Sequence, residues 1–335
     1  MRLVYIGFAF SHHINTHAGY HQIKNYVNYD YIIDCQNYFT KKNSKVNFIQ
    51  RIVRKLHYLI FNDWPFPFYI LKCIWLGLLH NDLVFHFIYG ENLYKNIKPF
   101  IRKGNKIVVT YHQPFEWFEK NPKHLKTIHS IDRIILMSDK EINKFKQFAP
   151  DSIIKFIPHG VDCNFYKINK NIIKKKMILT VGNWLRDYEF ANTVYKDFIK
   201  KHKDWEIKII TNKNNHIHIE KNSQITIESN ISDELLKQYY QQCSILFLPL
   251  IRYTANNALL EAGSCGCNII IASNFLDNSY ISNELIKTCS LKKEEAINLI
   301  EKSISSDFEY KLSNFIQTNY SWNKIGKCTS LFLTE

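Results

Sequence analysis

Short apolar runs rich in β-forming residues alternate with longer polar segments of helical pattern along most of the chain. Strands that alternate with helices build βαβ units and parallel sheets. Six runs lie before residue 161: LVYIGFAF at 3–10, YIID from 31, DLVFHFI from 82, KIVVTYH from 106, DRIILMS from 132 and IIKFIPHG from 153. After a lysine-rich link at 169–177 five more follow: MILTVGN from 177, WEIKIIT from 205, QITIE from 224, SILFLPL from 244 and NIIIAS from 268. The sequence therefore predicts an α/β fold of two Rossmann-like, doubly wound parallel-sheet domains, 1–170 and 171–335, facing a cleft.

The length supports two domains, because one hydrophobic core seldom organises 335 residues and a domain averages about 150. With 46% hydrophobic and 22% charged residues, the composition is that of a packed globular protein. Residues 305–335 have a helical pattern without a further strand, so this end could cap either half.

The chain is strongly basic, with a formal net charge of +14. This charge indicates an anionic partner but does not distinguish nucleic acid, anionic lipid and phosphorylated small molecules. The sequence has no recognition-helix, RNP or zinc-finger pattern, so no nucleic acid partner is expected. The eight cysteines are scattered without zinc-site spacing, which predicts reduced, mostly buried thiols and no metal ligands.

Targeting and membrane signals are weak. The N-terminal run lacks a long basic lead and a cleavage site, and the apolar stretch 64–79 contains two prolines and Lys72 and is too short to span a bilayer. A cytoplasmic location is expected. Residues 41–60 combine six cations with an apolar face, a pattern that fits peripheral binding to the anionic inner face of the membrane or a solvated basic face over the core.

The stretch TANNALLEAGSCGCNIII, 254–271, follows a predicted strand and carries a carboxylate within an apolar helix. Thr254 suits an N-cap, which would place the free N–H groups of 255–257, including Asn256 and Asn257, at a helix end that favours phosphate. Glu261 lies on nearly the same face as Asn257 and about 6 Å further along, where a carboxylate could accept two ribose hydroxyls. The alternative is a Glu that caps or pairs with a neighbouring Lys.

This stretch resembles the nucleotide-sugar segment of retaining glycosyltransferases of the two-Rossmann-domain (GT-B) architecture, specifically glycosyltransferase family 4. IPHGVD at 157–162, TVGNWLRD at 180–187 and YSWNKIGK at 320–327 are similar to further blocks of that family in order and spacing. The resemblance implies transfer of a sugar from a UDP- or GDP-sugar to a glycan or lipid-linked acceptor, in surface polysaccharide or glycolipid synthesis. It implies no cofactor and no essential metal, and a last helix, about 320–335, that packs back towards the N-terminal domain.

The resemblance also assigns roles on the donor side. It places Glu261 at the ribose and Arg186 on the diphosphate, in a loop with Gly182 and Asn183. Asn183 stands where the family has an Arg, and Tyr253 stands where the family has the Glu associated with the transferred sugar. Arg186 could instead pair with Asp187 or with a helix end.

In the first half, the resemblance places His112, at the end of a strand, near the donor sugar and the reaction centre. A structural hydrogen-bonding role is the alternative for this residue. The loop SHHINTHAGYHQI after the first strand is expected to line the space between donor and acceptor through His17, Gly19 and Tyr20, or else to be a solvated turn.

Three other functions remain open at this point. Tyr253 in place of Glu would fit a catalytically degenerate nucleotide-sugar-binding or partner subunit. A nucleotide-sugar epimerase could be built on the same fold. A nucleic-acid-binding protein would explain the charge, although no motif supports it.

Overall fold

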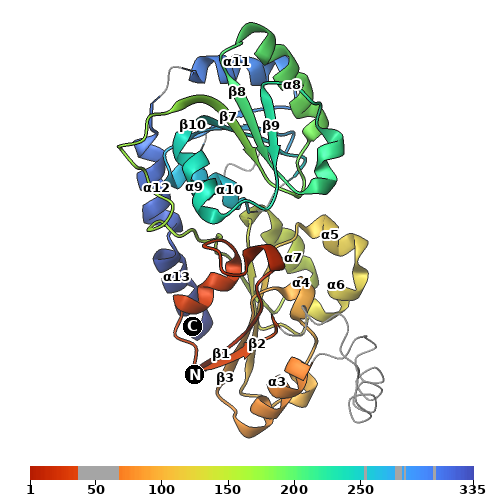
Figure 1. Cartoon of the computed structure of the whole chain (residues 1–335). Helices are drawn as coiled ribbons and strands as arrows, with labels where there is room; N and C mark the ends of the chain where they lie inside the picture. Colours follow the sequence, from red (N-terminus) through yellow and green to blue (C-terminus); the bar gives the residue numbers. More distant parts are fainter. Residues whose placement is uncertain (37–67, 253–254, 276–280, 283, 305–306) are drawn as a thin grey trace, which may run out of the picture. The chain divides into compact units, whose positions relative to one another are not determined.

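The computed structural model describes residues 1–36, 68–252, 255–275, 281–282, 284–304 and 307–335. These residues form two compact units (Figure 1). Unit 1 comprises Met1–Ile14, Gly19–Ile157 and Gly326–Glu335, and unit 2 comprises Asn15–Ala18 and Pro158–Ile325.

The division after Ile157 lies earlier than the expected boundary at residue 170. Residues just after the division bond within unit 2, because the Val161 N–H donates to the Tyr320 carbonyl at 2.9 Å and the Ser264 hydroxyl donates to the Tyr166 carbonyl. The end of the chain belongs to unit 1, where Arg133 Nη1 donates to the Leu333 carbonyl at 2.8 Å.

Unit 1 contains a six-stranded parallel sheet in the order β2-β1-β3-β4-β5-β6. The strands are β1 Arg2–Gly7, β2 Tyr31–Asp34, β3 Leu83–Phe87, β4 Lys106–Tyr111, β5 Arg133–Leu136 and β6 Ile153–Phe156. All six predicted runs are confirmed as strands. The central strand β3, LVFHF, is buried at every position, as expected for a parallel strand covered on both faces.

Short helices cover this sheet. They are η1 Ser11–His13, η2 Tyr20–Asn25, α3 Phe68–Leu79, α4 Gly90–Leu93, η3 Lys98–Phe100, α5 Phe115–Lys120, α6 Pro122–Ile128, η4 Asp139–Glu141 and α7 Ile142–Phe148. The basic segment 41–60 lies outside the described residues. In the described part of the chain, no helix is long and apolar enough to cross a membrane.

Unit 2 contains a second six-stranded parallel sheet, in the order β12-β11-β10-β7-β8-β9. The strands are β7 Lys175–Val181, β8 Glu206–Ile210, β9 Ile225–Glu228, β10 Cys243–Pro249, β11 Asn268–Ala272 and β12 Lys287–Cys289. The five predicted runs are confirmed. Strand β12 was not predicted, because its three residues, KTC, form no apolar run and bury only Cys289.

The helices of unit 2 cover both faces of its sheet. They are α8 Tyr188–Lys201, η5 Lys213–His218, α9 Asp233–Gln242, α10 Asn257–Ser264, α11 Lys293–Ser303, α12 Tyr310–Tyr320 and α13 Trp322–Thr334, which continues into unit 1. Helices α8 and α11 share one core cluster with the sheet, while α10 packs between α9, α12 and β11 (Figure 1). Two helices, α12 and α13, confirm the helical pattern predicted for the end of the chain.

The eight cysteines form no disulfide, and six of them are buried, as expected for reduced thiols. Cys243, at the start of β10, and Cys267, just before β11, bring their sulfur atoms within 3.3 Å of each other. Both thiols contact the Tyr240 carbonyl, so they act as packing groups at the end of α9.

Strand order locates the ligand-binding edge of each sheet. Open parallel sheets bind ligands beyond the carboxyl ends of the strands, at the point where the strand order reverses. In unit 2 this point lies between β7 and β10, and in unit 1 it lies between β1 and β3. The loops after these four strands are therefore the first places to look for function.

Close packing of α10 on α12 can be tested at Gly263. A Cβ at this position would lie 2.4 Å from Cδ1 of Ile316. We expect Gly263→Ala to cost about 1–3 kcal/mol by overpacking, offset in part by a helix-propensity gain of about 1 kcal/mol.

Ile316→Val removes the clashing methyl group, so the cost of Gly263→Ala should fall in that background. Equilibrium unfolding of the two single variants and the double variant measures the coupling, expected at about 1 kcal/mol or more. Additive free energies would contradict this packing.

Candidate functional site

The loop after β7 is fixed by backbone and side-chain hydrogen bonds. Gly182 has a φ of +139°, a backbone angle that residues other than glycine rarely adopt. Its carbonyl accepts from the Thr211 hydroxyl at 2.9 Å and from the Tyr188 hydroxyl at 2.5 Å. Asn183 is exposed and its side-chain oxygen accepts from the Asn212 N–H at 2.7 Å. This loop therefore holds a fixed shape at the ligand-binding edge of the sheet.

Arg186 folds back over this loop. Its Nε donates to the Val181 carbonyl at 3.0 Å and its Nη1 to the Trp184 carbonyl at 3.1 Å, while the guanidinium covers Gly182 so closely that a Cβ there would meet Nη2 at 2.5 Å. Burial lowers the pKa of Arg186 below its usual value. Among the described residues, no carboxylate pairs with Arg186.

The alternative partner, Asp187, has another role. Its side chain accepts from the Phe190 N–H at 2.8 Å and caps α8, while its own N–H donates to the Pro249 carbonyl at 3.0 Å. Backbone hydrogen bonds thus tie the β7 loop to the end of β10. The cation of Arg186 is left for a ligand or for solvent.

Helix α10 begins at Asn257, with Asn256 as its N-cap, so the N–H groups of its first turn belong to 257–259 and not to 255–257 as expected. The predicted cap Thr254 and the neighbouring Tyr253 lie outside the described residues. Asn256 can replace Thr254 because Asn and Thr both accept from a first-turn N–H, here that of Leu259 at 3.3 Å.

Asn256 joins the helix end to Arg186. Its side-chain oxygen accepts from Arg186 Nη2 at 3.4 Å, and its amide nitrogen Nδ2 is buried without a hydrogen-bond partner in the described structure. The guanidinium, this amide and the amino end of α10 are three positive or donor groups at one place. Such a group of donors fits an anion.

Glu261 lies one helical turn after Asn257 and is only 5% exposed. Its Oε2 accepts from the Tyr240 hydroxyl at 3.0 Å, and no lysine or other cation pairs with it in the described part of the chain, so the alternative of a Glu–Lys pair is wrong. Burial raises the pKa of Glu261 to about 7, against the Tyr240 hydrogen bond, which lowers it. A carboxyl with one committed oxygen can still accept from a hydroxyl on its other side.

Sequence reasoning missed the aromatic surroundings of Glu261. Tyr240 comes from α9 and stacks edge-on against Tyr166, with ring centroids 6.0 Å apart. Phe165 in turn lies under the ring of His17, with centroids 3.7 Å apart. These residues are far apart in sequence, so only an alignment of homologues or a structure would have linked them.

His17 belongs to unit 2 through its contacts, although most of the surrounding N-terminal chain belongs to unit 1. Its ring Nδ1 lies 2.7 Å from Asp162 Oδ2. The backbone N–H of His17 donates to Asp233 Oδ2 at 2.6 Å. Asp233 also raises the pKa of Glu261 through its charge. The predicted first-loop residue thus lies in the same set of contacts as the predicted ribose ligand.

His112 lies at the end of β4 in unit 1. Its Nε2 donates to the Ile88 carbonyl at 2.9 Å, and burial lowers the pKa of His112 to about 4, so the ring is neutral with Nδ1 as an acceptor. The His112 ring contacts the buried ring of Tyr20, with centroids 4.8 Å apart. Gly19 is the N-cap of η2, with a φ of +94°. Tyr20, the first residue of η2, is buried in unit 1 and does not line an open loop.

A second buried carboxyl, missed from sequence, supports this end of β4. Glu91 in α4 accepts from the backbone N–H groups of His112 and Gln113, and burial raises the pKa of Glu91 to about 7. The signal was available in YGEN, a glycine and an acid directly after a strand, but this pattern is common in α/β loops. Glu91 holds the loop that carries His112.

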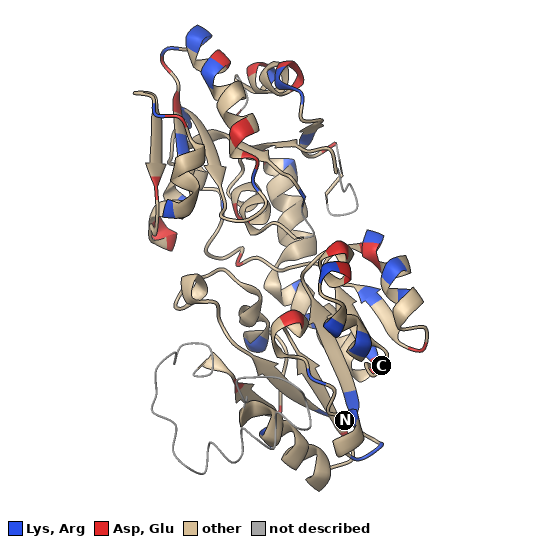
Figure 2. Ribbon diagram, turned by 90° about the vertical axis from the view of Figure 1, so that its right-hand side faces the viewer, with Lys and Arg blue, Asp and Glu red and all other residues tan. Residues whose placement is uncertain are grey.

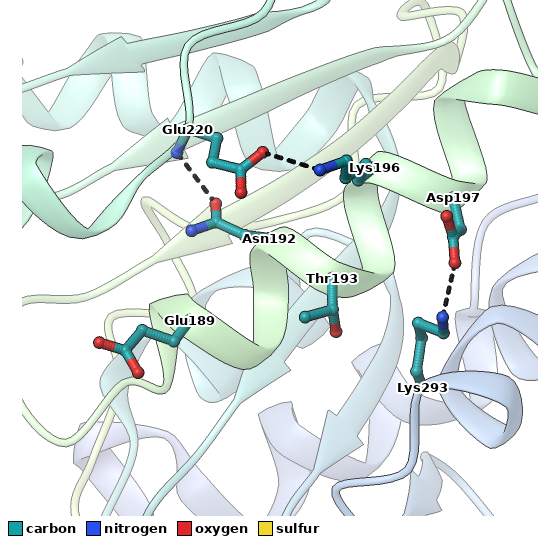
Figure 3. A pocket seen from close by; sticks show the side chains of 7 residues that line it. All are labelled: Glu189, Asn192, Thr193, Lys196, Asp197, Glu220 and Lys293. Atoms are coloured by element: carbon teal, nitrogen blue, oxygen red, sulfur yellow. Dashed lines mark hydrogen bonds and ion pairs between the residues drawn. The ribbon is translucent and has the colours of Figure 1, made fainter.

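A shallow pocket lies elsewhere, along α8 (Figure 3). Its charged side chains are already paired: Lys196 with Glu220 at 3.8 Å, Lys293 with Asp197 at 2.7 Å and Glu189 with His218 at 3.9 Å. Its two lysines are therefore neutralised by carboxylates, unlike the guanidinium of Arg186. The described residues also contain no group of three or more His, Cys, Asp or Glu side chains arranged to hold a metal ion.

No family model matches the chain, and no curated protein matches it by sequence. Solved structures do match. Sucrose-phosphate synthase from Thermosynechococcus elongatus matches 100% of this chain and 98% of its own, with a TM-score of 0.71 and 10% identity. The fold is GT-B.

Two further structures agree with the GT-B fold. The α,α-trehalose-phosphate synthase (UDP-forming) from Burkholderia xenovorans covers 80% of this chain and 76% of its own, with a TM-score of 0.60 and 10% identity. A trehalose-6-phosphate synthase studied for glycosyl transfer with retention covers 100% of this chain and 99% of its own, with a TM-score of 0.66 and 10% identity. The resemblance read from the sequence is confirmed for the fold.

Burial of Glu261 makes a prediction about stability and pH. Its folded pKa of about 7 lies above the ordinary value of 4.5, so ionising this side chain costs free energy in the folded state. The cost is absent below about pH 4.5, grows as the pH rises and is complete above about pH 7, at about 3 kcal/mol. Glu261→Gln should therefore stabilise the protein relative to wild type at pH 8 but not at pH 4.5.

Urea unfolding at both pH values measures this difference. Tyr240→Phe is the matched variant: it removes the donor to the carboxylate and should lower stability at pH 8 more than at pH 4.5. A Glu261→Gln effect that does not change with pH would contradict the burial of an ionisable carboxyl.

Proposed function

We propose that this chain is a retaining glycosyltransferase that moves a sugar from a nucleoside diphosphate sugar to an acceptor hydroxyl. The observation that carries the proposal is a group of donors with Glu261 one turn beyond it: the Arg186 guanidinium and the Asn256 amide nitrogen, which have no carboxylate and no acceptor respectively among the described residues, and the amino end of α10. The group lies at the strand-order reversal of a sheet with the standard dinucleotide-binding order.

The diphosphate is assigned to this group of donors. A guanidinium fork holds two phosphate oxygens, and the first-turn N–H groups of α10 add further donors. As the bond to the sugar breaks, negative charge builds on the diphosphate while the sugar becomes cation-like. Donors already in place stabilise that charge more in the transition state than in the ground state.

The ribose is assigned to Glu261. The helical rise places its carboxyl about 6 Å from the amino end of α10, close to the separation of a nucleotide's diphosphate and its ribose hydroxyls. Ribose hydroxyls donate best to the ionised carboxylate, and the pKa of Glu261 lies at about 7. Donor binding should therefore strengthen as the pH rises through 7.

His112 is assigned to the donor sugar on the basis of the family resemblance. A neutral ring with Nδ1 as acceptor suits a sugar hydroxyl and excludes a role as a general acid at neutral pH. In the proposed mechanism the departing diphosphate takes the proton of the acceptor hydroxyl, so no side chain is needed as a base. The acceptor is a glycan or a lipid-linked sugar used on the cytoplasmic side in surface polysaccharide or glycolipid synthesis.

A catalytically degenerate binder is the second candidate, because Tyr253 stands where the family has Glu. The two candidates differ in one product. An active transferase commonly transfers sugar slowly to water, so a donor-hydrolysis assay should release nucleoside diphosphate. A protein that binds donor and releases none would be the degenerate form.

A thermal-shift panel of UDP-, GDP-, ADP- and CMP-sugars identifies the donor. A nucleotide at 100 times its Kd adds about 2.7 kcal/mol of stability, which gives a measurable shift. Failure of every nucleotide sugar to stabilise the protein would contradict the proposal.

Arg186 is expected to dominate the chemical step. Arg186→Ala should lower kcat/KM about a hundredfold, the loss of about 3 kcal/mol seen when one transition-state donor is removed. Arg186→Lys should recover part of the rate, since it keeps the charge but not the fork. Lys176→Ala, at an exposed cation of unit 2 paired with Asp204, is the matched control and should keep full activity.

Metal independence is a separate expectation. With charge stabilisation assigned to Arg186 and α10, the purified protein should keep its activity in EDTA. Addition of Mg²⁺ or Mn²⁺ after chelation should change the rate less than twofold. That corresponds to a change of less than about 0.4 kcal/mol in the activation free energy. A strict requirement for either ion would contradict the assignment.

A further inference from the structure

Helix α3 of unit 1 presents an apolar face to solvent. Its exposed large side chains are Phe68, Leu71, Trp75, Leu78 and Leu79, each between 43% and 62% exposed. At 100° per residue these five positions lie within about 120° of one another. The opposite face, with Tyr69, Ile70, Cys73 and Gly77, is buried in unit 1.

This arrangement departs from an ordinary surface helix, which turns polar residues outward. Contiguous exposed apolar side chains of this size mark an interaction surface. Phe100, 37% exposed, extends the patch, because the segment that carries it bonds to α3: the Arg102 N–H donates to the Gly77 carbonyl at 3.0 Å.

The charges on α3 itself and on residues 94–105 are all positive. Lys72 lies on the exposed side of α3, and Arg102 and Lys103 are exposed beside its carboxyl end. No Asp or Glu occurs in 68–81 or in 94–105, and the nearby Asp82 is bound to Arg2 at 2.7 Å. Figure 2 shows α3 as a nearly uncharged helix, in contrast to the mixed charges on the helices of unit 2.

We propose that this surface, the α3 face with Phe100, Lys72, Arg102 and Lys103, docks the protein on an anionic phospholipid bilayer. Apolar side chains enter the headgroup region, Trp75 takes the interfacial position that tryptophan favours, and the three cations contact lipid phosphates. Twelve residues span about 18 Å, too short to cross the hydrocarbon core but suited to lying along its surface. A protein partner or second copy would be expected to meet a polar rim, which needs no excess of one charge sign.

Lipid binding of this kind does not rest on the proposed glycosyl transfer. Bilayer docking would remain if no sugar were transferred, and transfer to a soluble glycan would remain if the protein did not dock. The two proposals therefore fail separately.

Vesicle sedimentation with the full chain tests the proposal. Native protein should pellet with vesicles of phosphatidylglycerol and phosphatidylethanolamine and much less with phosphatidylcholine. The variant Leu71→Ser/Trp75→Ser/Leu78→Ser should bind at least about tenfold more weakly, since each side chain loses apolar burial. Leu331→Ser and Ile173→Ser, at exposed apolar residues outside the patch, are the controls and should bind as the native protein does.

The cations make a second, independent readout. Lys72→Gln/Arg102→Gln/Lys103→Gln should lose about fivefold in affinity per charge for anionic vesicles and should flatten the salt dependence. Binding to phosphatidylcholine should not change.

Brominated lipids test the depth of Trp75 without disturbing the apolar surface. They should quench part of the native fluorescence, and Trp75→Phe should remove that part while binding persists; Trp184→Phe should leave it in place. Unchanged vesicle binding of the triple serine variant would overturn the proposal. So would a native dimer that this variant makes monomeric with vesicle binding intact, because the face would then be a surface for a second copy.

Discussion

A guanidinium that is partly removed from water is stabilised by an anion, because losing hydration costs free energy unless a partner replaces it. Arg186 has backbone carbonyls and the Asn256 oxygen as acceptors, but no carboxylate in the described structure. The neighbouring acid that could have neutralised it, Asp187, caps α8 instead. The rest of the site depends on this charge. A helix amino end beside a cation without a carboxylate partner favours a phosphate over water.

The fold places that charge by topology. Because the strand order of unit 2 reverses between β7 and β10, the loops after these two neighbouring strands lead to helices on opposite faces of the sheet. Gly182 lets the first loop turn back, and backbone bonds from Asp187 and Ile251 join it to the second. The side chains of Arg186 and Asn256, 70 residues apart, are thereby brought within hydrogen-bonding distance.

The fold could be predicted from the sequence where it rests on local patterns. Eleven apolar runs were predicted as strands and are strands. Continuous runs rich in Val, Ile and Leu are typical of parallel strands that are buried on both faces of a sheet. Strand β12 and the start of α10 were harder to predict. The three residues of β12 are too few to show a periodicity. At α10, the nearby Thr254 and Asn256 are both residue types that suit an N-cap. Tyr240 and Asp233 could not have been found, because their roles follow from contacts between segments distant in sequence, and the pattern that contains Glu91 is too common in α/β loops to single it out. Tyr253, Thr254 and the basic segment 41–60 lie outside the described residues, so their assignments stay predictions.

Several of the groups assigned to the nucleotide are costly to the protein without a ligand. Arg186 is partly desolvated, the amide nitrogen of Asn256 is buried without an acceptor among the described residues, and burial raises the pKa of Glu261. A core chosen for stability alone would replace these groups by apolar side chains. Phosphate oxygens could accept hydrogen bonds from Arg186 and Asn256, and a sugar hydroxyl could donate to Glu261. Ligand binding would therefore offset part of the free energy that burying these groups costs. Retention of such costs at one edge of one sheet is the pattern expected of a site shaped by its ligand rather than by packing.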